Sequence, residues 1–173
     1  MLNSVSDLKR IAITNTLRRS QLFSGLSSGD LQKIVEITFI KSLDRGEYLF
    51  REGDPSRGFY IVQSGAINVH RVSSSGKEQI IHIFRAGESL AEATLATEVG
   101  YPADARAVEG SQVFLVQKAG FLLLLKHQPE LALRMLAGMA LHLRVLIQQI
   151  EDLSLKDEES RLASWLVNRL SLI

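Results

Sequence analysis

The sequence predicts a mainly β domain with flanking helices: an antiparallel, jelly-roll-like β-roll with helices before it and one long helix after it. Glycines cut residues 37 to 118 into short apolar runs at gaps of mostly about ten residues, which is the spacing of strands and turns in an antiparallel roll or barrel. Towards the C-terminus, apolar residues from Leu136 to Leu153 recur every three and four positions, which indicates a helix with one apolar face.

The segment before the roll, up to about residue 36, has a helical pattern. Ser27 and Asp30, three residues apart, form a helix-start signal. Leu31, Ile34 and Val35 follow at helical spacing. We therefore expect a helix to begin close to Ser27.

Within the roll, residues 59–62 read Phe-Tyr-Ile-Val and predict a buried strand. Ser64 and Gly65 predict a turn, after which residues 66–72 alternate as a half-buried strand does. Residues 73–76, Ser-Ser-Ser-Gly, predict the tip of a hairpin, and residues 79–84 predict its returning strand.

The long helix is expected to begin at Pro129, with Glu130 in its first turn, where a carboxylate suits the helix dipole. Its apolar residues form a heptad seam that predicts a parallel homodimer. The predicted dimer interface consists of Leu136, Met139, Leu143, Leu146, Ile150 and Leu153. Residues 154–158 break the seam, and a second helix is expected from Glu159 to Leu170.

Composition excludes several classes of function. The net charge of +1 gives no strong field for nucleic acid or an anionic membrane. The chain has no cysteine, which excludes disulfides, thiolate zinc sites and cysteine-ligated iron–sulfur clusters. No apolar run is long enough to span a bilayer and no signal core follows Met1, so we expect a cytoplasmic protein without a membrane partner. A phosphate-binding loop, a nucleophile elbow and a paired acid–base set are all missing, which predicts that the chain is not an enzyme.

Several segments, in their order and spacing, resemble the CRP/FNR family of bacterial transcription regulators, which has the cyclic-nucleotide-binding-domain fold. They are Leu22 to Leu26, Gly46 to Asp54, Phe59 to Gly65, the pair Ala91-Glu92 with Ala105 to Ala107, and Asp157 with Arg161 to Leu166. The resemblance covers nearly the whole chain.

This resemblance implies three parts. Residues 1–126 would be the effector-sensing domain, 127–156 the dimerisation helix, and 157–173 the start of a truncated or absent DNA-binding domain, with Asp157 at the hinge. No basic recognition helix is evident, so DNA would be contacted only through a C-terminal domain missing from this chain. The chain is either a piece of a longer regulator or a free-standing sensor domain, and the alternative function is a stand-alone interaction module with no effector.

The family's nucleotide binders carry a Gly-Glu pair and, after a loop, an arginine followed by a small polar residue. Here Glu92 fits the ribose-binding position, but Ala91 replaces the glycine and Tyr101-Pro102 stand where the arginine and its neighbour belong. A cyclic phosphate needs a guanidinium and N–H donors, and Pro102 has no N–H. We therefore expect no cyclic nucleotide to bind.

The same comparison places Leu146 and Ile147 where nucleotide binders offer hydroxyl groups, which predicts an apolar effector pocket for a small molecule or gas. Its expected residues are Leu90, Glu92, Leu95, Tyr101, Leu143, Leu146 and Ile147. The subgroup most similar in appearance is that of the dissimilatory nitrate respiration regulator (DNR), whose members are regarded as haem-dependent nitric-oxide sensors. The resemblance thus suggests haem as cofactor.

A haem iron needs an axial ligand, most often histidine. The chain has four: His70, His82, His127 and His142. His142 lies nearest the presumed pocket, and His82 lies among isoleucines, which predicts that one of its faces is buried. We therefore name His142 and His82 as the candidate ligands, and an ordinary buried or exposed histidine is the alternative for each.

Overall fold

The structure is a computed structural model that describes residues 4–155. It divides into two compact units, Met1–Gly138 and Met139–Ile173. The first unit holds every strand and the start of the long helix, and the described part of the second unit is the remainder of that helix. Among the described residues, no helix is both long and apolar enough to cross a membrane.

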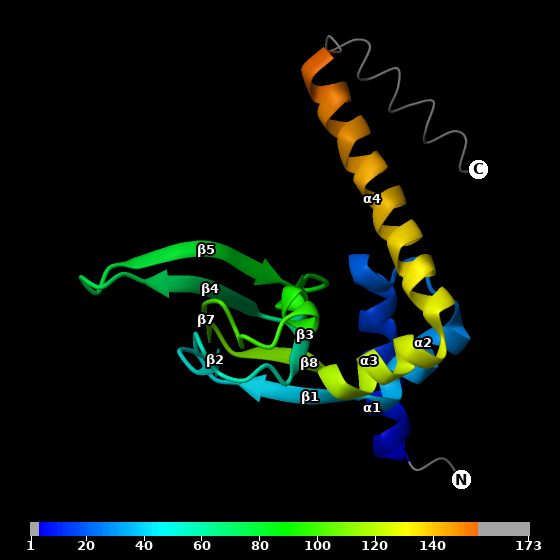
Figure 1. Ribbon diagram of the computed structural model, residues 1–173, viewed down its shortest axis with the longest axis horizontal. Helices are drawn as coiled ribbons and strands as arrows, with labels where there is room; N and C mark the ends of the chain where they lie inside the picture. Colours follow the sequence, from blue (N-terminus) through cyan, green and yellow to red (C-terminus); the bar gives the residue numbers. More distant parts are fainter. Residues whose placement is uncertain (1–3, 156–173) are drawn as a thin grey trace. The chain divides into compact units, whose positions relative to one another are not determined.

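The order of elements confirms the predicted fold class (Figure 1). Helical elements come first: α1 (Ser4–Arg19), η1 (Gln21–Phe23) and α2 (Ser28–Glu36). The roll comprises β1 (Thr38–Leu43), β2 (Tyr48–Phe50), β3 (Gly58–Ser64), β4 (Ala66–Val72), β5 (Glu78–Arg85), β6 (Ser89–Leu90), η2 (Glu92–Ala96), β7 (Asp104–Ala107) and β8 (Ser111–Gln117). Two helices follow, α3 (Lys118–His127) and α4 (Pro129–Leu155). The helix α3 was not predicted as a separate element, because its apolar run Phe121 to Leu125 has no helical periodicity of its own.

The strands form two four-stranded sheets, in the orders β1-β8-β3-β6 and β2-β7-β4-β5, and every described pairing is antiparallel. Successive side chains of a strand point to opposite faces of a sheet. In β3, Phe59 and Ile61 pack in a core with the helices, whereas Tyr60 and Val62 pack in a second core inside the roll. The strand is therefore buried on both faces, as its unbroken apolar run predicts.

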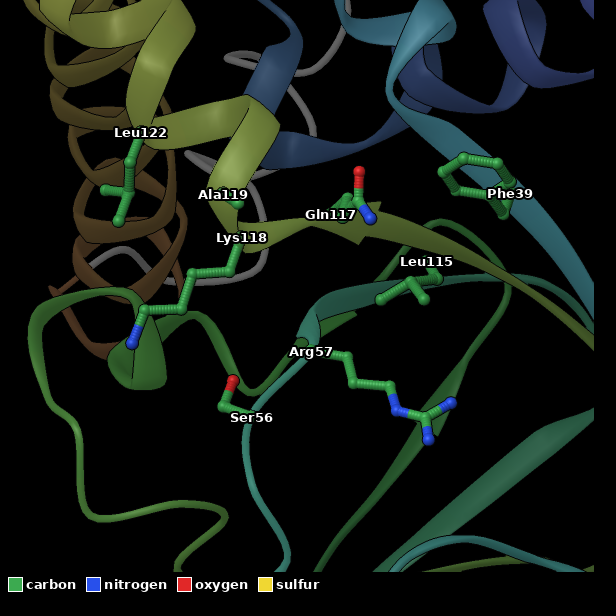
Figure 2. Close-up of a pocket in the computed structure, with 8 residues that line it drawn as sticks. All are labelled: Phe39, Ser56, Arg57, Leu115, Gln117, Lys118, Ala119 and Leu122. Atoms are coloured by element: carbon green, nitrogen blue, oxygen red, sulfur yellow. The ribbon is translucent and has the colours of Figure 1, made fainter.

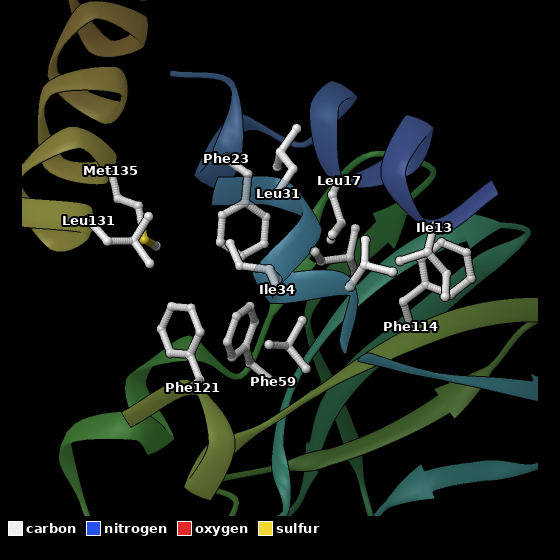
Figure 3. Packing of buried hydrophobic residues seen from close by; sticks show 13 residues of the cluster. Ile13, Leu17, Phe23, Leu31, Ile34, Phe59, Phe114, Phe121, Leu131 and Met135 are labelled. Carbon is white, nitrogen blue, oxygen red and sulfur yellow. The ribbon is translucent and has the colours of Figure 1, made fainter. Parts of the chain in front are cut away.

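The core on the helical side joins the N-terminal helices, one face of the first sheet and the start of α4 (Figure 3). At its centre the ring of Phe59 lies 6.1 Å from that of Phe23 and 5.2 Å from that of Phe121, both in tilted or edge-on geometry. Leu131 and Met135 bring the first turns of α4 into the same core. The helix α3 is held to the domain by Phe121, whose ring is buried in this core. Most of the other apolar residues of α3 stay partly exposed.

The predicted start of α2 is confirmed. Ser27 is the N-cap, and its Oγ accepts a hydrogen bond from the backbone N–H of Asp30 (3.2 Å) and donates one to the Asp30 carboxylate (2.9 Å). The same carboxylate accepts a charge-assisted bond from Arg134 of α4 (3.0 Å). Burial raises the pKa of Asp30, but the hydrogen bonds from Ser27 and Arg134 and the charge of Lys33 outweigh burial, so the pKa lies below its usual value.

Two glycines let α4 approach the turn after η1. A Cβ on Gly138 would lie 3.2 Å from the backbone nitrogen of Gly25, and a Cβ on Gly25 would lie 3.2 Å from the Cα of Gly138. Because such distances are tighter than most Cβ contacts in proteins, this contact favours glycine on both sides.

The helix α4 begins at Pro129, as predicted. Leu136, Leu143 and Ile150 of the predicted seam are 61, 57 and 62 % exposed in the single chain, and Met139 and Leu146 are also exposed. Three predicted features lie outside the described residues: the side chain of Leu153, the expected hinge residue Asp157 and the second helix expected from Glu159 to Leu170.

Candidate effector site

The loop that the family resemblance matches to the phosphate-binding segment of nucleotide binders runs from β6 through η2 to β7. Ala91 has φ = +70°, the left-handed conformation that costs a non-glycine residue about 1–2 kcal/mol. Its carbonyl accepts hydrogen bonds from the hydroxyl (2.7 Å) and the N–H (3.1 Å) of Thr94, which hold the backbone in this conformation. The sequence places alanine where the backbone favours the glycine of the nucleotide binders.

Tyr101, at the position expected for the phosphate-binding arginine, is buried and fully engaged with the protein. Its ring stacks on Phe50 with centroids 3.8 Å apart and planes 11° apart. Its hydroxyl donates to the carbonyl of Gly58 (3.0 Å) and accepts from the N–H of Arg57 (3.2 Å). The side chain of Tyr101 therefore fills space in the roll and offers no cation to a phosphate.

The hydroxyl of Tyr60 lies 3.3 Å from that of Tyr101. Burial, together with the hydrogen bond to Tyr101, raises the pKa of Tyr60 far above its usual value, so this phenol stays neutral. The phenol of Tyr60 therefore adds no negative charge to the interior of the roll.

The carbonyl of Pro102 accepts a hydrogen bond from Nε of Arg71 (3.1 Å). A hollow of about 450 Å³ lies beside this contact on the loop. Its lining residues include Arg71, Thr94, Thr97 and Tyr101. Arg106 of β7 forms an ion pair of 3.1 Å with Glu78.

The other predicted effector residues are distributed between the two units. Leu90 is buried in the core inside the roll, and Leu95 packs partly buried against the core on the helical side. Glu92 is partly exposed at the start of η2. Leu143, Leu146 and Ile147 belong to the second unit, so the pocket that they would form with the roll stays a prediction.

The four histidines have different surroundings. The expectation that one face of His82 is buried is wrong: β5 is the edge strand of its sheet, the His82 side chain is 52 % exposed, and its Nε2 lies 3.2 Å from a Glu88 oxygen. His127 contacts the carbonyl of Leu123 through Nδ1 (2.9 Å). His142 is partly buried on α4, and its Nε2 has no hydrogen-bond partner among the described residues. His70 is completely buried.

A second hollow, of about 620 Å³, lies at the junction of α3 with the first sheet (Figure 2). Phe39, Leu115, Ala119 and Leu122 give it an apolar lining, to which Ser56, Arg57, Gln117 and Lys118 add polar groups. None of the predicted effector residues lines it. Sequence analysis missed this groove because its residues come from three segments far apart in the chain.

No group of three or more histidine, cysteine, aspartate or glutamate side chains that could hold a metal ion occurs in the part of the chain that the structure describes.

Comparison with known proteins identifies the family to which this fold belongs. The profile of the family described as "Cyclic nucleotide-binding domain" matches residues 40–128. The anaerobic regulatory protein of Bacillus subtilis is 32% identical over 150 residues, which are 86% of this chain and 63% of that protein. The cyclic AMP receptor protein of Thermus thermophilus is 26% identical over 154 residues, 89% of this chain and 71% of that protein.

Among solved structures, the sensor domain of the transcriptional regulator DNR from Pseudomonas aeruginosa superposes with a TM-score of 0.68 at 33% identity, covering 86% of this chain and 99% of that one. The match therefore covers that sensor domain almost from end to end, whereas this chain spans 63% of the length of the Bacillus regulator.

Proposed function

Because the chain belongs to the cyclic nucleotide-binding domain family, we propose that it is the effector-sensing and dimerisation part of a cytoplasmic CRP/FNR-type transcription regulator, and not an enzyme. DNA would be contacted by a further C-terminal domain. An effector bound at the roll would act by favouring one of two arrangements of the paired α4 helices, which requires only that it bind the two arrangements with different affinity.

The effector is not a cyclic nucleotide. The observation that carries this point is Tyr101, whose ring is stacked on Phe50 and whose hydroxyl is bonded to the backbone at the place where a phosphate would need an arginine. A cyclic phosphate beside Tyr101 and Pro102 would lack the arginine of the nucleotide binders, and Arg71, which lines the hollow there, already donates through Nε to the carbonyl of Pro102. Each charge-assisted hydrogen bond that the phosphate lacks costs about 1.5–3 kcal/mol.

Calorimetry tests this point directly. Titration of the chain with cyclic AMP and cyclic GMP should give no binding in the micromolar range, while the Thermus cyclic AMP receptor protein serves as the positive control. The variant Pro102→Arg should also fail to bind, because Leu146 and Ile147 still offer no hydroxyl groups. A micromolar dissociation constant for the unmodified chain would overturn the proposal.

The exposed seam of α4 supports a homodimer. Side chains such as Leu143 and Ile150 are more than half exposed in the single chain, and burying each of them fully is worth about 1.5–3 kcal/mol. The double variant Leu143→Glu/Ile150→Glu should be monomeric by light scattering at micromolar concentration. Leu141→Glu is the matched control, because Leu141 is equally exposed on α4 but lies off the seam. A monomeric unmodified chain would contradict the proposal.

For the effector itself we propose an apolar planar ligand, with haem as the candidate. His142 is the preferred axial ligand, since its Nε2 is free of hydrogen bonds among the described residues, whereas Nε2 of His82 contacts Glu88. Bound haem would supply an iron that takes up nitric oxide, and His142 would hold and orient it.

A haem titration followed by the Soret band tests this proposal, with each of the four histidines changed to alanine in turn. We expect saturable binding, a spectrum altered by His142→Ala, and no change with His127→Ala. A flat titration, or a spectrum that none of the four substitutions alters, would exclude histidine-ligated haem and leave the rest of the proposed function intact.

A further inference from the structure

A buried histidine lies in the roll, away from the proposed effector site. His70 is in β4, next to Val69, whose side chain packs against the core inside the roll. Successive residues of a strand point to opposite faces, so the His70 ring lies on the outer face of the second sheet. It is nevertheless 0 % exposed, and its ring centroid lies 6.2 Å from that of Tyr48 on β2.

Neither ring nitrogen of His70 has a hydrogen-bond partner among the described residues. A neutral imidazole carries one N–H donor and one acceptor nitrogen, and burying both without partners is unfavourable. An apolar residue at this position of β4 would avoid the cost of burying two unpaired ring nitrogens.

Two carboxylates lie close to His70 and favour a histidine at this position. Nε2 of His70 lies 3.5 Å from an oxygen of Glu78 on β5 and 3.9 Å from an oxygen of Asp104 on β7. Protonation would give the ring a second N–H and a positive charge, so that Nε2 could bond to either carboxylate after a shift of a few tenths of an ångström. A further charged group in this network is Arg106 of β7, which pairs with Glu78 at 3.1 Å, and the guanidinium of Arg51 lies 3.6 Å from the centroid of the Tyr48 ring.

His70 lies where its interaction with the two carboxylates can connect the strands on either side of β4. In the pairing of β4 with β5, Val69 is opposite His82 and His70 is opposite Ile80, so Ile81 forms a bulge at this point. Glu78 begins β5, on the tip side of the hairpin, which projects from the roll (Figure 1). Asp104 begins β7, the strand on the other side of β4.

We propose that His70 is a proton-dependent latch that ties the tip side of the β4–β5 hairpin to β7 across β4. With His70 protonated, the positive charge of the imidazolium attracts the carboxylates of both Glu78 and Asp104, and the strands β4 and β5 stay paired on the tip side of the bulge. With His70 neutral, this charge attraction is lost, Glu78 keeps its ion pair with Arg106, and the tip side of the hairpin opens more often. The latch is independent of the effector proposed above.

Hydrogen exchange of the full chain tests the latch. Exchange is measured at several values from about pH 5.5 to about pH 8, the interval in which histidines change charge, and is corrected for the intrinsic effect of pH. We expect the amides of residues 78–82 to be protected several-fold more at the acidic end. The amides of β3, which pair on a different sheet, should not change.

Three variants identify the group responsible. Glu78→Gln should abolish the pH dependence of residues 78–82, and so should His70→Gln. Arg106→Gln also breaks the ion pair of Glu78 with Arg106 but leaves His70 facing two carboxylates, so it should keep the pH dependence. His82→Gln, at an exposed histidine of the same hairpin, should keep it too.

Protection that does not depend on pH in the unmodified chain would overturn the proposal, as would pH dependence that survives Glu78→Gln or disappears in His82→Gln. If His70→Gln fails to fold, the comparison of Glu78→Gln with Arg106→Gln still decides, because both positions lie at the surface.

Discussion

The contact between Gly25 and Gly138 makes a specific prediction for Gly138→Ala. In the interior of a free helix, alanine is favoured over glycine by about 1 kcal/mol. Here the new Cβ would lie 3.2 Å from the nitrogen and 3.3 Å from the Cα of Gly25, and both are backbone atoms that cannot rotate away. Overpacking of this kind costs about 1–3 kcal/mol, so we expect a net destabilisation of about 1 kcal/mol.

Urea unfolding followed by circular dichroism measures this change, with the protein concentration held fixed because association affects apparent stability. Gly29→Ala is the matched control: Gly29 also lies in a helix, but the nearest atom to its added Cβ would be Oγ of Ser27 at 3.8 Å. It should stabilise the chain by about 0.5 kcal/mol. If Gly138→Ala stabilises the chain as much as Gly29→Ala does, the close approach of α4 to the turn is refuted.

Three further substitutions test the contacts around the loop and the start of α2. Tyr101→Phe keeps the stacked ring but leaves the carbonyl of Gly58 without its donor, and should cost about 1–3 kcal/mol in urea unfolding. Asp30→Asn should cost about 1 kcal/mol at neutral pH through the weakened bond to Arg134. Because the pKa of Asp30 is lowered in the folded state, its charge stabilises fully above the unfolded value of about 3.9, so this difference should shrink as pH falls below about 4 in parallel acid titrations. Ala91→Gly should raise stability by about 0.5–1 kcal/mol in thermal unfolding, because it relieves a left-handed backbone, and a loss of stability would show that the backbone there is unstrained.

The sequence predicted the architecture well because local signals agree with the fold. Ser27 and Asp30 cap α2, Pro129 begins α4, and the apolar run from Phe59 to Val62 is a strand buried on both faces. Each of these signals depends on residues within a few positions of one another, which periodicity and capping rules describe.

Features that depend on distant residues escaped prediction. His82 sits among isoleucines, but β5 has no neighbour on one side and is exposed along most of its length. The burial of His70 follows from Tyr48, Glu78 and Asp104, which pairing brings onto the ring from three other strands. No pattern along the chain distinguishes these two histidines, since both lie in apolar strands.

The double-sided burial of β3 and β8 has a consequence for how a signal crosses the domain. The two strands form a common wall: Tyr60 and Val113 face the roll interior, while Phe59 and Phe114, one peptide bond away, face the helices. A ligand that pushes Tyr60 therefore moves the backbone that carries Phe59, and the aromatic contacts of Phe59 with Phe23 and Phe121 must follow. Because β3 and β8 are packed closely on both faces, they can transmit a displacement by moving together as one rigid body, without successive side-chain rearrangements.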